Sequence, residues 1–194
     1  MMRVSKSSEA ALPTKYGDFR VYGFSGGGRE YMVLTRGDVS GENVLLRIHS
    51  ACLTGDVFHS LRCDCGDQFQ EALAKIMDED RGMLIYLPHH EGRGIGILNK
   101  LAAYELQDKG ADTVEANEQL GFEGDERDYD FIPGILSHFR VESVRLMTNN
   151  PEKIKALEKH GVKVARVPLI IPPQKKNEKY LETKKKRMGH MLDR

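Results

Sequence analysis

The chain has 194 residues, of which 40% are apolar and 30% are charged, and its 29 basic side chains balance 29 acidic ones. This composition is typical of a globular domain, and a zero net charge argues against a protein whose main task is to coat nucleic acid or an anionic membrane. No apolar run approaches the roughly 20 residues that span a bilayer, and the polar stretch 1–15 lacks the apolar core of a signal peptide, so we expect a cytoplasmic protein without a membrane partner.

Six short runs rich in β-forming residues predict strands. They lie at 19–24, 31–34, 44–48, 83–87, 144–147 and 162–167. The glycines at 26–28 predict a turn between the first two strands. Since the first three strands follow one another without helices between them, we expect a mixed sheet rather than a purely parallel one.

Three helices are predicted from periodicity and from their end signals. The first follows the cysteines, where apolar residues share one helical face at positions 69, 73, 76 and 77. The second covers 97–107. The third covers 151–160, since Asn150 can cap it, Pro151 suits its first turn and Gly161 ends it.

Strands that alternate with helices predict an α/β fold with α+β character. We expect a single domain over 1–194, in which a mixed, partly antiparallel sheet is flanked by helices. The basic C-terminal segment 174–194 is rich in lysine between 174 and 187, and we interpret that run as a solvated helix face or a mobile tail.

The cysteines lie close together in the sequence, at Cys52, Cys63 and Cys65. A catalytic zinc commonly has three protein ligands and a fourth position for water, whose pKa it lowers to about 7. Three buried cysteines acting as small apolar residues are the alternative, but polar neighbours such as Asp64 make a poor apolar core. The spacing therefore predicts an open zinc site. His49 and His59 lie nearby in sequence, either as groups that support the ligands or as ordinary surface histidines.

A glycine-rich turn follows the predicted strand 83–87 and reads His89-His90-Glu91-Gly92-Arg93-Gly94-Ile95-Gly96. Glycines permit close backbone approach to a ligand, and Arg93 can bind phosphate or carboxylate oxygens. The turn matches neither the dinucleotide-binding fingerprint nor the phosphate-loop spacing. Adjacent side chains rarely point at one metal ion, so we expect a loop role for the two histidines.

Two further polar segments are candidates for ligand contacts. The segment 125–128 is either a solvated charged loop or a site in which one carboxylate accepts a proton and Arg127 stabilises an oxyanion. Thr148 and Lys153 lie where a strand ends and a helix begins, which is where α/β sheets commonly bind ligands. Both are candidate phosphate contacts.

Taken in order, these segments resemble the GTP cyclohydrolase II family, which opens riboflavin biosynthesis. The matching stretches are Arg47-Ile-His-Ser, Cys52-Leu-Thr-Gly-Asp-Val-Phe, Ser60-Leu-Arg-Cys-Asp-Cys-Gly, Glu91-Gly-Arg-Gly-Ile-Gly, Leu98-Asn-Lys-Leu, Asp112-Thr-Val-Glu-Ala-Asn, Leu120-Gly-Phe, Asp125-Glu-Arg-Asp, Leu146-Met-Thr-Asn-Asn-Pro-Glu-Lys, Tyr180-Leu-Glu-Thr-Lys and Met188-Gly-His. They cover nearly the whole chain, and the cysteine block alone is highly specific.

The resemblance implies a cytoplasmic homodimer that converts GTP and water to a 2,5-diamino-6-ribosylamino-4(3H)-pyrimidinone 5′-phosphate, formate and pyrophosphate. It implies one Zn²⁺ per subunit, held by Cys52, Cys63 and Cys65, and Mg²⁺ bound with the triphosphate. The implied substrate-binding residues are Arg47, Gln68, Glu91, Gly92, Arg93, Thr113, Thr148 and Lys153. The implied catalytic residues are Asp125 as proton acceptor, Arg127 as nucleophile toward the α-phosphorus, and Tyr104 in ring opening.

The roles of two of these residues can be weighed by their chemistry. Glu91 offers a carboxylate that can accept from the N1–H and the 2-amino group of guanine. An arginine with a pKa above about 12 is a poor nucleophile, so our hypothesis is that Arg127 chiefly stabilises charge at the α-phosphate. A guanylyl adduct trapped on Arg127 would contradict that hypothesis.

The chain departs from the family's usual pattern at two places. The family usually has Glu where this chain has Ala51, and Arg-Gln where it has His89-His90. These changes favour an alternative, a zinc-containing GTP-binding paralogue with weak or altered activity, whereas retention of Tyr104 favours the complete reaction. A third reading, a zinc module that binds nucleic acid, is disfavoured by the zero net charge and by the lack of a paired-ligand pattern.

Overall fold

The computed structural model describes residues 3–123 and 125–192. The chain forms two compact units. The first runs from the N-terminus to His49 and adds Gln70–Leu87 and Asp128–Leu169; the second comprises Ser50–Phe69, Pro88–Arg127 and the chain from Ile170 onward. None of the helices in the described ranges combines the length and apolar character needed to cross a bilayer.

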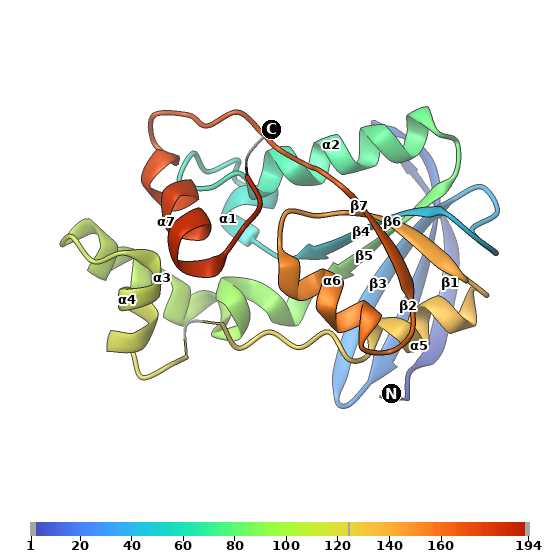
Figure 1. Cartoon of the computed structure of the whole chain (residues 1–194), viewed down its shortest axis with the longest axis horizontal. Helices are drawn as coiled ribbons and strands as arrows, with labels where there is room; N and C mark the ends of the chain where they lie inside the picture. Colours follow the sequence, from blue (N-terminus) through green and yellow to red (C-terminus); the bar gives the residue numbers. More distant parts are fainter. Residues whose placement is uncertain (1–2, 124, 193–194) are drawn as a thin grey trace. The chain divides into compact units, whose positions relative to one another are not determined.

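The first unit is built on one mixed, seven-stranded sheet, drawn in Figure 1. Its strands are β1 (Ser5–Thr14), β2 (Gly17–Gly26), β3 (Arg29–Arg36), β4 (Val44–Ser50), β5 (Gly82–Leu87), β6 (Ser143–Met147) and β7 (Lys163–Val167), and they lie in the order β1-β2-β3-β5-β4-β6-β7. The neighbours among β1, β2, β3 and β5 are antiparallel, and β4, β6 and β7 are parallel. The predicted α/β class with a mixed, partly antiparallel sheet is confirmed.

All six predicted strands are present, and β1 was missed. The side chains of β1 are exposed up to its last residue, so this edge strand shows none of the apolar alternation that predicts a strand, and backbone pairing with β2 holds it. The predicted turn at 26–28 joins β2 to β3, where Gly27 and Gly28 have φ values of 58° and 73°. Two residues with positive φ are what a tight hairpin turn requires.

Helices cover both faces of this sheet, as expected. They are α5 (Ile132–His138), α6 (Pro151–Glu158) and the part of α2 (Cys65–Asp78) that begins at Gln70. Strand residues such as Leu46 and Ile85 form one apolar core with Ile132 of α5 and Leu157 of α6. The predicted start of α6 is confirmed in detail, because the Asn150 side chain accepts the Glu152 N–H at 2.9 Å.

The second unit is mainly helical. Its elements are α1 (Leu53–Asp56), the start of α2, a 3₁₀ segment η1 (Pro88–Gly94), α3 (Gly96–Asp108), α4 (Thr113–Gln119) and α7 (Glu178–Met188). The helix predicted at 97–107 is α3. Segment η1 and helix α4 were not predicted, because they are short, whereas α7 lies in the lysine-rich run interpreted as a solvated helix face or a mobile tail. In α4, for example, Asp112 and Glu115 form a capping box that fixes the first turn of a helix without a continuous apolar face.

We predict that Ile85→Ala lowers the free energy of unfolding by about 2–5 kcal/mol, because it opens a cavity at a fully buried position of β5. Urea unfolding followed by circular dichroism measures this change. Met32→Ala on the adjacent strand β3 is the matched control, since Met32 is exposed and its loss should leave stability nearly unchanged. Equal effects of the two substitutions would contradict this assignment of the core.

Candidate active site

Three cysteine side chains converge in the second unit. Cys52 directly precedes α1, Cys63 lies in the loop that follows, and Cys65 begins α2. Their Sγ atoms all lie within 4.8 Å of one another, and those of Cys52 and Cys63 are 3.7 Å apart. A tetrahedral zinc with Zn–S bonds of about 2.3 Å places its sulfur ligands about 3.8 Å apart. The cluster can therefore hold a metal ion, and its spacing suits zinc.

Two glycines make room for this cluster. A Cβ atom on Gly55 would lie 2.9 Å from Cys63 Sγ and 3.2 Å from Cys52 Sγ. A Cβ atom on Gly66 would lie 2.3 Å from the Gly55 carbonyl oxygen. Larger residues at these positions would push α1 away from the start of α2 and separate the sulfur atoms, so close approach explains both glycines.

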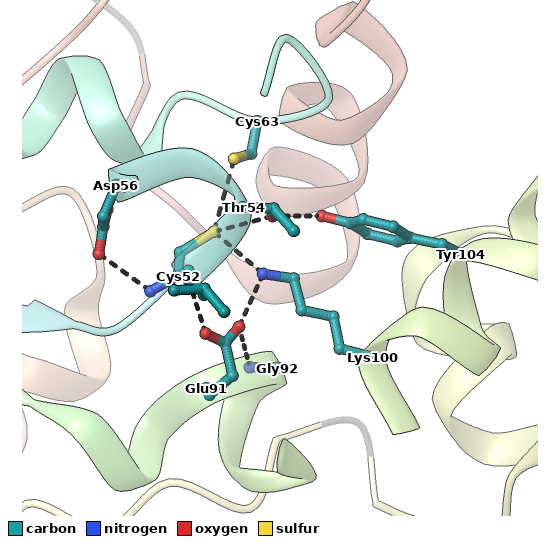
Figure 2. A network of polar contacts seen from close by, with 9 residues as sticks. Cys52, Thr54, Asp56, Cys63, Glu91, Gly92, Lys100 and Tyr104 are labelled. Carbon is teal, nitrogen blue, oxygen red and sulfur yellow. Dashed lines mark hydrogen bonds and ion pairs between the residues drawn. The ribbon is translucent and has the colours of Figure 1, made fainter. Parts of the chain in front are cut away.

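A buried ammonium group lies against the cluster, as Figure 2 shows. Lys100 Nζ on α3 donates to Cys52 Sγ at 3.1 Å and to Glu91 Oε1 at 2.7 Å. Hydrogen bonds from the Cys63 and Cys65 thiols lower the pKa of Cys52, and Lys100 lowers it further. Burial lowers the pKa of Lys100, but the Cys52 thiolate and Glu91 outweigh burial and raise it. The hydrogen bond and the directions of both pKa shifts favour the charged forms of Lys100 and Cys52.

Glu91 is anchored on both carboxylate oxygens. Its Oε2 accepts the Leu53 N–H at 2.6 Å, and its Oε1 accepts the Gly92 N–H at 3.1 Å in addition to Lys100. Sequence reasoning gave this side chain a role in binding guanine. In the structure it also joins the glycine-rich turn to the first residue of α1.

The glycine-rich turn has an unusual backbone conformation. Gly92, Arg93 and Gly94 have φ values of 60°, 65° and 97°, the left-handed region that favours glycine. A Cβ atom on Gly94 would lie 2.9 Å from Glu126 Cβ, and the Arg93 carbonyl oxygen accepts the Glu126 N–H at 3.0 Å. The turn thus packs directly on the segment that holds Asp125 and Arg127.

Tyr104 lies one helical turn after Lys100 on α3 and faces the same cluster. Its hydroxyl is 3.0 Å from Thr54 Oγ1, which is 3.7 Å from Cys52 Sγ. The Arg62 guanidinium lies 4.7 Å from the centre of the Tyr104 ring and pairs with Asp108. Burial raises the pKa of Tyr104, so its phenol is protonated near neutral pH.

Asp125 and Arg127 form a two-pronged ion pair. Arg127 Nε donates to Asp125 Oδ1 at 2.7 Å, and Nη2 donates to Oδ2. Burial raises the pKa of Asp125, but the hydrogen bonds and charge of Arg127 outweigh burial and hold it below its usual value. Arg127 Nη1 also lies 3.4 Å from Ser50 Oγ, which is 3.2 Å from His90 Nδ1. A guanidinium only donates, so the Ser50 hydroxyl accepts from Arg127 and keeps its own proton available for a further hydrogen bond.

A cavity of about 100 Å³, space for several water molecules, opens beside these groups. The predicted site residues that line it are Cys52, Cys63, Cys65, Gly92, Arg93, Tyr104, Thr113 and Arg127. Ala51 and His90, two of the departures from the family pattern, also line it. His90 is buried within η1, which places the two histidines on a tight helical turn rather than in an open loop.

The C-terminal helix is bonded to the cysteine loop, which corrects our interpretation of the lysine-rich segment. Lys184 of α7 pairs with Asp64 at 2.7 Å, and Asp64 is only 2% exposed. Gln68, a predicted substrate-binding residue, donates to the other Asp64 oxygen at 2.6 Å. Asn177 also lies 3.5 Å from the Cys63 carbonyl oxygen. One face of α7 is therefore buried, whereas Lys185 and Lys186 are exposed as a solvated helix face would be. Buried and exposed lysines within one run give no sequence signal that separates them.

The remaining predicted residues belong to the first unit. Arg47 on β4 donates to the Met147 carbonyl oxygen at 2.9 Å, and Lys153 on α6 donates to the Ile48 carbonyl oxygen at 2.7 Å. Thr148 follows β6 directly and is buried. Since β4 and β6 are parallel neighbours, all three side chains gather where these strands end, as the sequence predicted for Thr148 and Lys153. His49 is buried in the same unit, with its ring stacked 5.6 Å from that of Tyr86, so it is not a surface histidine.

The residues that sequence reasoning missed are Lys100, Lys184 and Gly55. Lys100 belongs to the matched stretch Leu98-Asn-Lys-Leu, and its spacing of four from Tyr104 places both on one face of a helix. That spacing was the available signal. Lys184 pairs with a residue 120 positions earlier, which no local pattern reveals.

Comparison with known proteins gives one consistent result. The family model described as GTP cyclohydrolase II matches residues 5–168. The chain is 53% identical over 188 residues to GTP cyclohydrolase-2 of Picrophilus torridus, with 95% of this chain and 97% of that protein covered. It is 55% identical over 195 residues to GTP cyclohydrolase-2 of Pseudomonas paraeruginosa, with 98% and 95% covered. It is 52% identical over 193 residues to riboflavin biosynthesis protein RibBA of Endomicrobium trichonymphae, covering 97% of this chain but 48% of that protein.

We predict that Asp64→Asn lowers the free energy of unfolding by about 3–5 kcal/mol, because it leaves the buried Lys184 ammonium without its counter-charge. The measurement is urea unfolding at neutral pH. Glu182→Gln is the matched control on the same helix, since the Glu182–Lys186 pair is exposed and its loss should leave stability unchanged. If Asp64→Asn were as mild as the control, α7 would not depend on this ion pair.

Proposed function

The chain belongs to the GTP cyclohydrolase II family, a family of hydrolases, and we propose that it converts GTP to 2,5-diamino-6-ribosylamino-4(3H)-pyrimidinone 5′-phosphate, formate and pyrophosphate as the first step of riboflavin biosynthesis. One observation in the structure supports this specific reaction in addition to membership of the family. Three thiols close enough to share one metal ion line the same cavity as a protonated tyrosine and Arg127, whose guanidinium is paired with the Asp125 carboxylate. Hydrolysis at a purine carbon needs an activated water and a proton donor, and hydrolysis at a phosphate needs a positive charge that binds its oxygens. We also propose that the enzyme is a cytoplasmic homodimer.

Cys52, Cys63 and Cys65 would hold Zn²⁺, one ion per subunit, and Mg²⁺ would accompany the triphosphate. Zinc held by these three thiolates would supply a water molecule whose pKa is lowered to near neutral. Thiolates are soft ligands that favour zinc over magnesium, so the cysteines would not hold the Mg²⁺.

Tyr104 and Asp125 are the residues that would transfer protons. Because burial keeps the Tyr104 phenol protonated, it can donate a proton or a hydrogen bond beside the cysteine cluster. Asp125 is ionised near neutral pH and can accept a proton, although its paired arginine makes it a weak base.

Basic side chains would stabilise the negative charge of the phosphate groups. Arg93 and Arg127 line the cavity of the second unit. Lys153 and Arg47 are candidates by family resemblance alone, and in the first unit they bond to backbone carbonyl oxygens. Arg127 is already bonded to both oxygens of Asp125, which favours its charged form and supports a role in charge stabilisation rather than as a nucleophile. Arg93 can bind phosphate oxygens as its sequence context suggested.

The alternative is a GTP-binding paralogue with weak or altered activity. A specific observation favours it: Ala51 and His90 line the cavity itself, so both departures from the family pattern alter the surface that a ligand would meet. An imidazole can replace an amide as a hydrogen-bonding group, and His90 Nδ1 already lies within hydrogen-bonding distance of Ser50 Oγ. The methyl group of Ala51 cannot replace a carboxylate.

Incubation of the zinc-loaded protein with GTP and Mg²⁺ tests the proposal. We predict equimolar formate and pyrophosphate, loss of formate release after removal of zinc with a chelator, and its recovery when zinc is restored. Cys63→Ser should abolish formate release by removing one metal ligand.

The outcomes separate the two candidate functions. Equal amounts of both products establish the complete reaction and make Ala51 and His90 tolerated variations. Binding of GTP with neither product released would overturn the proposal in favour of the paralogue. Release of pyrophosphate without formate would overturn only the proposal that the enzyme opens the purine ring.

A further inference from the structure

We propose that Lys100 is a positioning residue that couples the cysteine cluster to Glu91 and Tyr104, so that metal binding and the placement of both side chains depend on one ammonium group. The proposal deepens the proposed function and rests on it, because it assumes that the cysteines hold zinc. No role was assigned to Lys100 by sequence reasoning.

The contacts of Lys100 are unusual for a lysine. Its residue is 8% exposed, and lysines are almost never buried to that degree unless they are paired. Its Nζ has two close partners, Cys52 Sγ at 3.1 Å and Glu91 Oε1 at 2.7 Å, and it lies 5.7 Å from the centre of the Tyr104 ring. Figure 2 shows these groups arranged around the Lys100 side chain.

Charge explains the contact with Cys52. A Zn²⁺ ion with three thiolates carries a net charge of −1, and a buried net charge is costly unless it is paired. The Lys100 ammonium would make the assembly neutral. An N–H···S hydrogen bond also fixes the direction of the thiolate, and partners of this kind typically change metal affinity by about 10–100-fold when they are removed.

Geometry explains the contact with Glu91. The same carboxylate accepts the backbone N–H of Leu53, the residue after Cys52, and that of Gly92 in the glycine-rich turn. Lys100 therefore closes a ring of contacts that joins the start of α1, the turn and α3. A shift of Cys52 would therefore displace Glu91. These contacts hold the candidate metal ligand and the candidate guanine-binding carboxylate in a fixed position relative to each other.

Lys100→Met tests this inference, because methionine keeps the length of the side chain and removes its charge. Lys100→Gln removes the same charge but keeps an N–H donor, so it serves if the methionine variant does not fold. Lys109→Met is the matched control, since Lys109 follows the same helix α3 and forms an exposed pair with Glu105. Thermal unfolding followed by circular dichroism identifies the variants that fold.

The first readout is zinc affinity, measured by competition with a chromophoric chelator. We expect the Lys100 variants to bind zinc about 10–100-fold more weakly than the unmodified protein and Lys109→Met to bind it equally well. The second is the sulfur-to-metal charge-transfer absorption of the Co²⁺-loaded protein, which should shift in the Lys100 variants alone. Neither readout depends on turnover.

A double-mutant cycle tests the coupling itself. Glu91→Gln, Lys100→Met and the double variant are compared for zinc affinity, and residues in one network give effects that do not multiply. We expect the double variant to bind zinc at least about threefold more tightly than the product of the two single effects requires. Simple multiplication of the single effects would overturn the coupling.

The results distinguish this proposal from the proposed function. If the unmodified protein binds no zinc, the proposed function itself fails. If it binds zinc and releases formate while the Lys100 variants match Lys109→Met in affinity and Co²⁺ spectrum, the proposed function stands and the role of Lys100 is overturned. Weaker zinc binding with an unshifted Co²⁺ spectrum would also contradict a hydrogen bond to the ligand sulfur.

Discussion

Three cysteine sulfur atoms lie within 4.8 Å of one another, and this arrangement depends on space around the sulfurs and on a nearby positive charge. Several residues of the second unit supply both. Gly55 and Gly66 supply the space, because a Cβ atom on either would collide with a sulfur or with the facing backbone. Lys100 supplies the charge through its contact with Cys52. The cluster then fixes α1, the start of α2 and α3 with respect to one another, and the cavity takes its walls from the same elements.

The chemistry that this arrangement supports is divided between groups of different charge. A protonated phenol, Tyr104, lies beside the thiols, whereas the ionised pair of Asp125 and Arg127 lies where the glycine-rich turn packs. Under the proposed function, the groups beside the thiols would donate protons and Arg127 would stabilise charge. The buried Asp64–Lys184 pair ties the C-terminal helix to the loop that carries Cys63 and Cys65, so a helix remote in sequence supports the ligands.

The parts of this account that the sequence predicted are those with a local signal. Six strands, the α6 cap at Asn150 and the convergence of the cysteines follow from periodicity, capping chemistry and ligand spacing. Strand β1 could not be predicted, because pairing with β2 rather than burial of its side chains holds it. The burial of Lys184 was missed for a related reason, since its partner is 120 residues away. The resemblance to a family implied a set of site residues, whereas the contact of Glu91 with Lys100 has no local sequence signal and is seen only in the folded chain.

If the three cysteines hold zinc and leave one coordination position open for water, X-ray absorption at the zinc edge of the metal-loaded protein will show it directly. We predict three sulfur ligands at about 2.3 Å and one oxygen ligand at about 2.0 Å from each zinc ion. Four sulfur ligands would mean a closed structural site, and an all-nitrogen-and-oxygen shell would mean that the cysteines do not hold the metal. Either result would contradict a zinc site with three cysteine ligands and one open position.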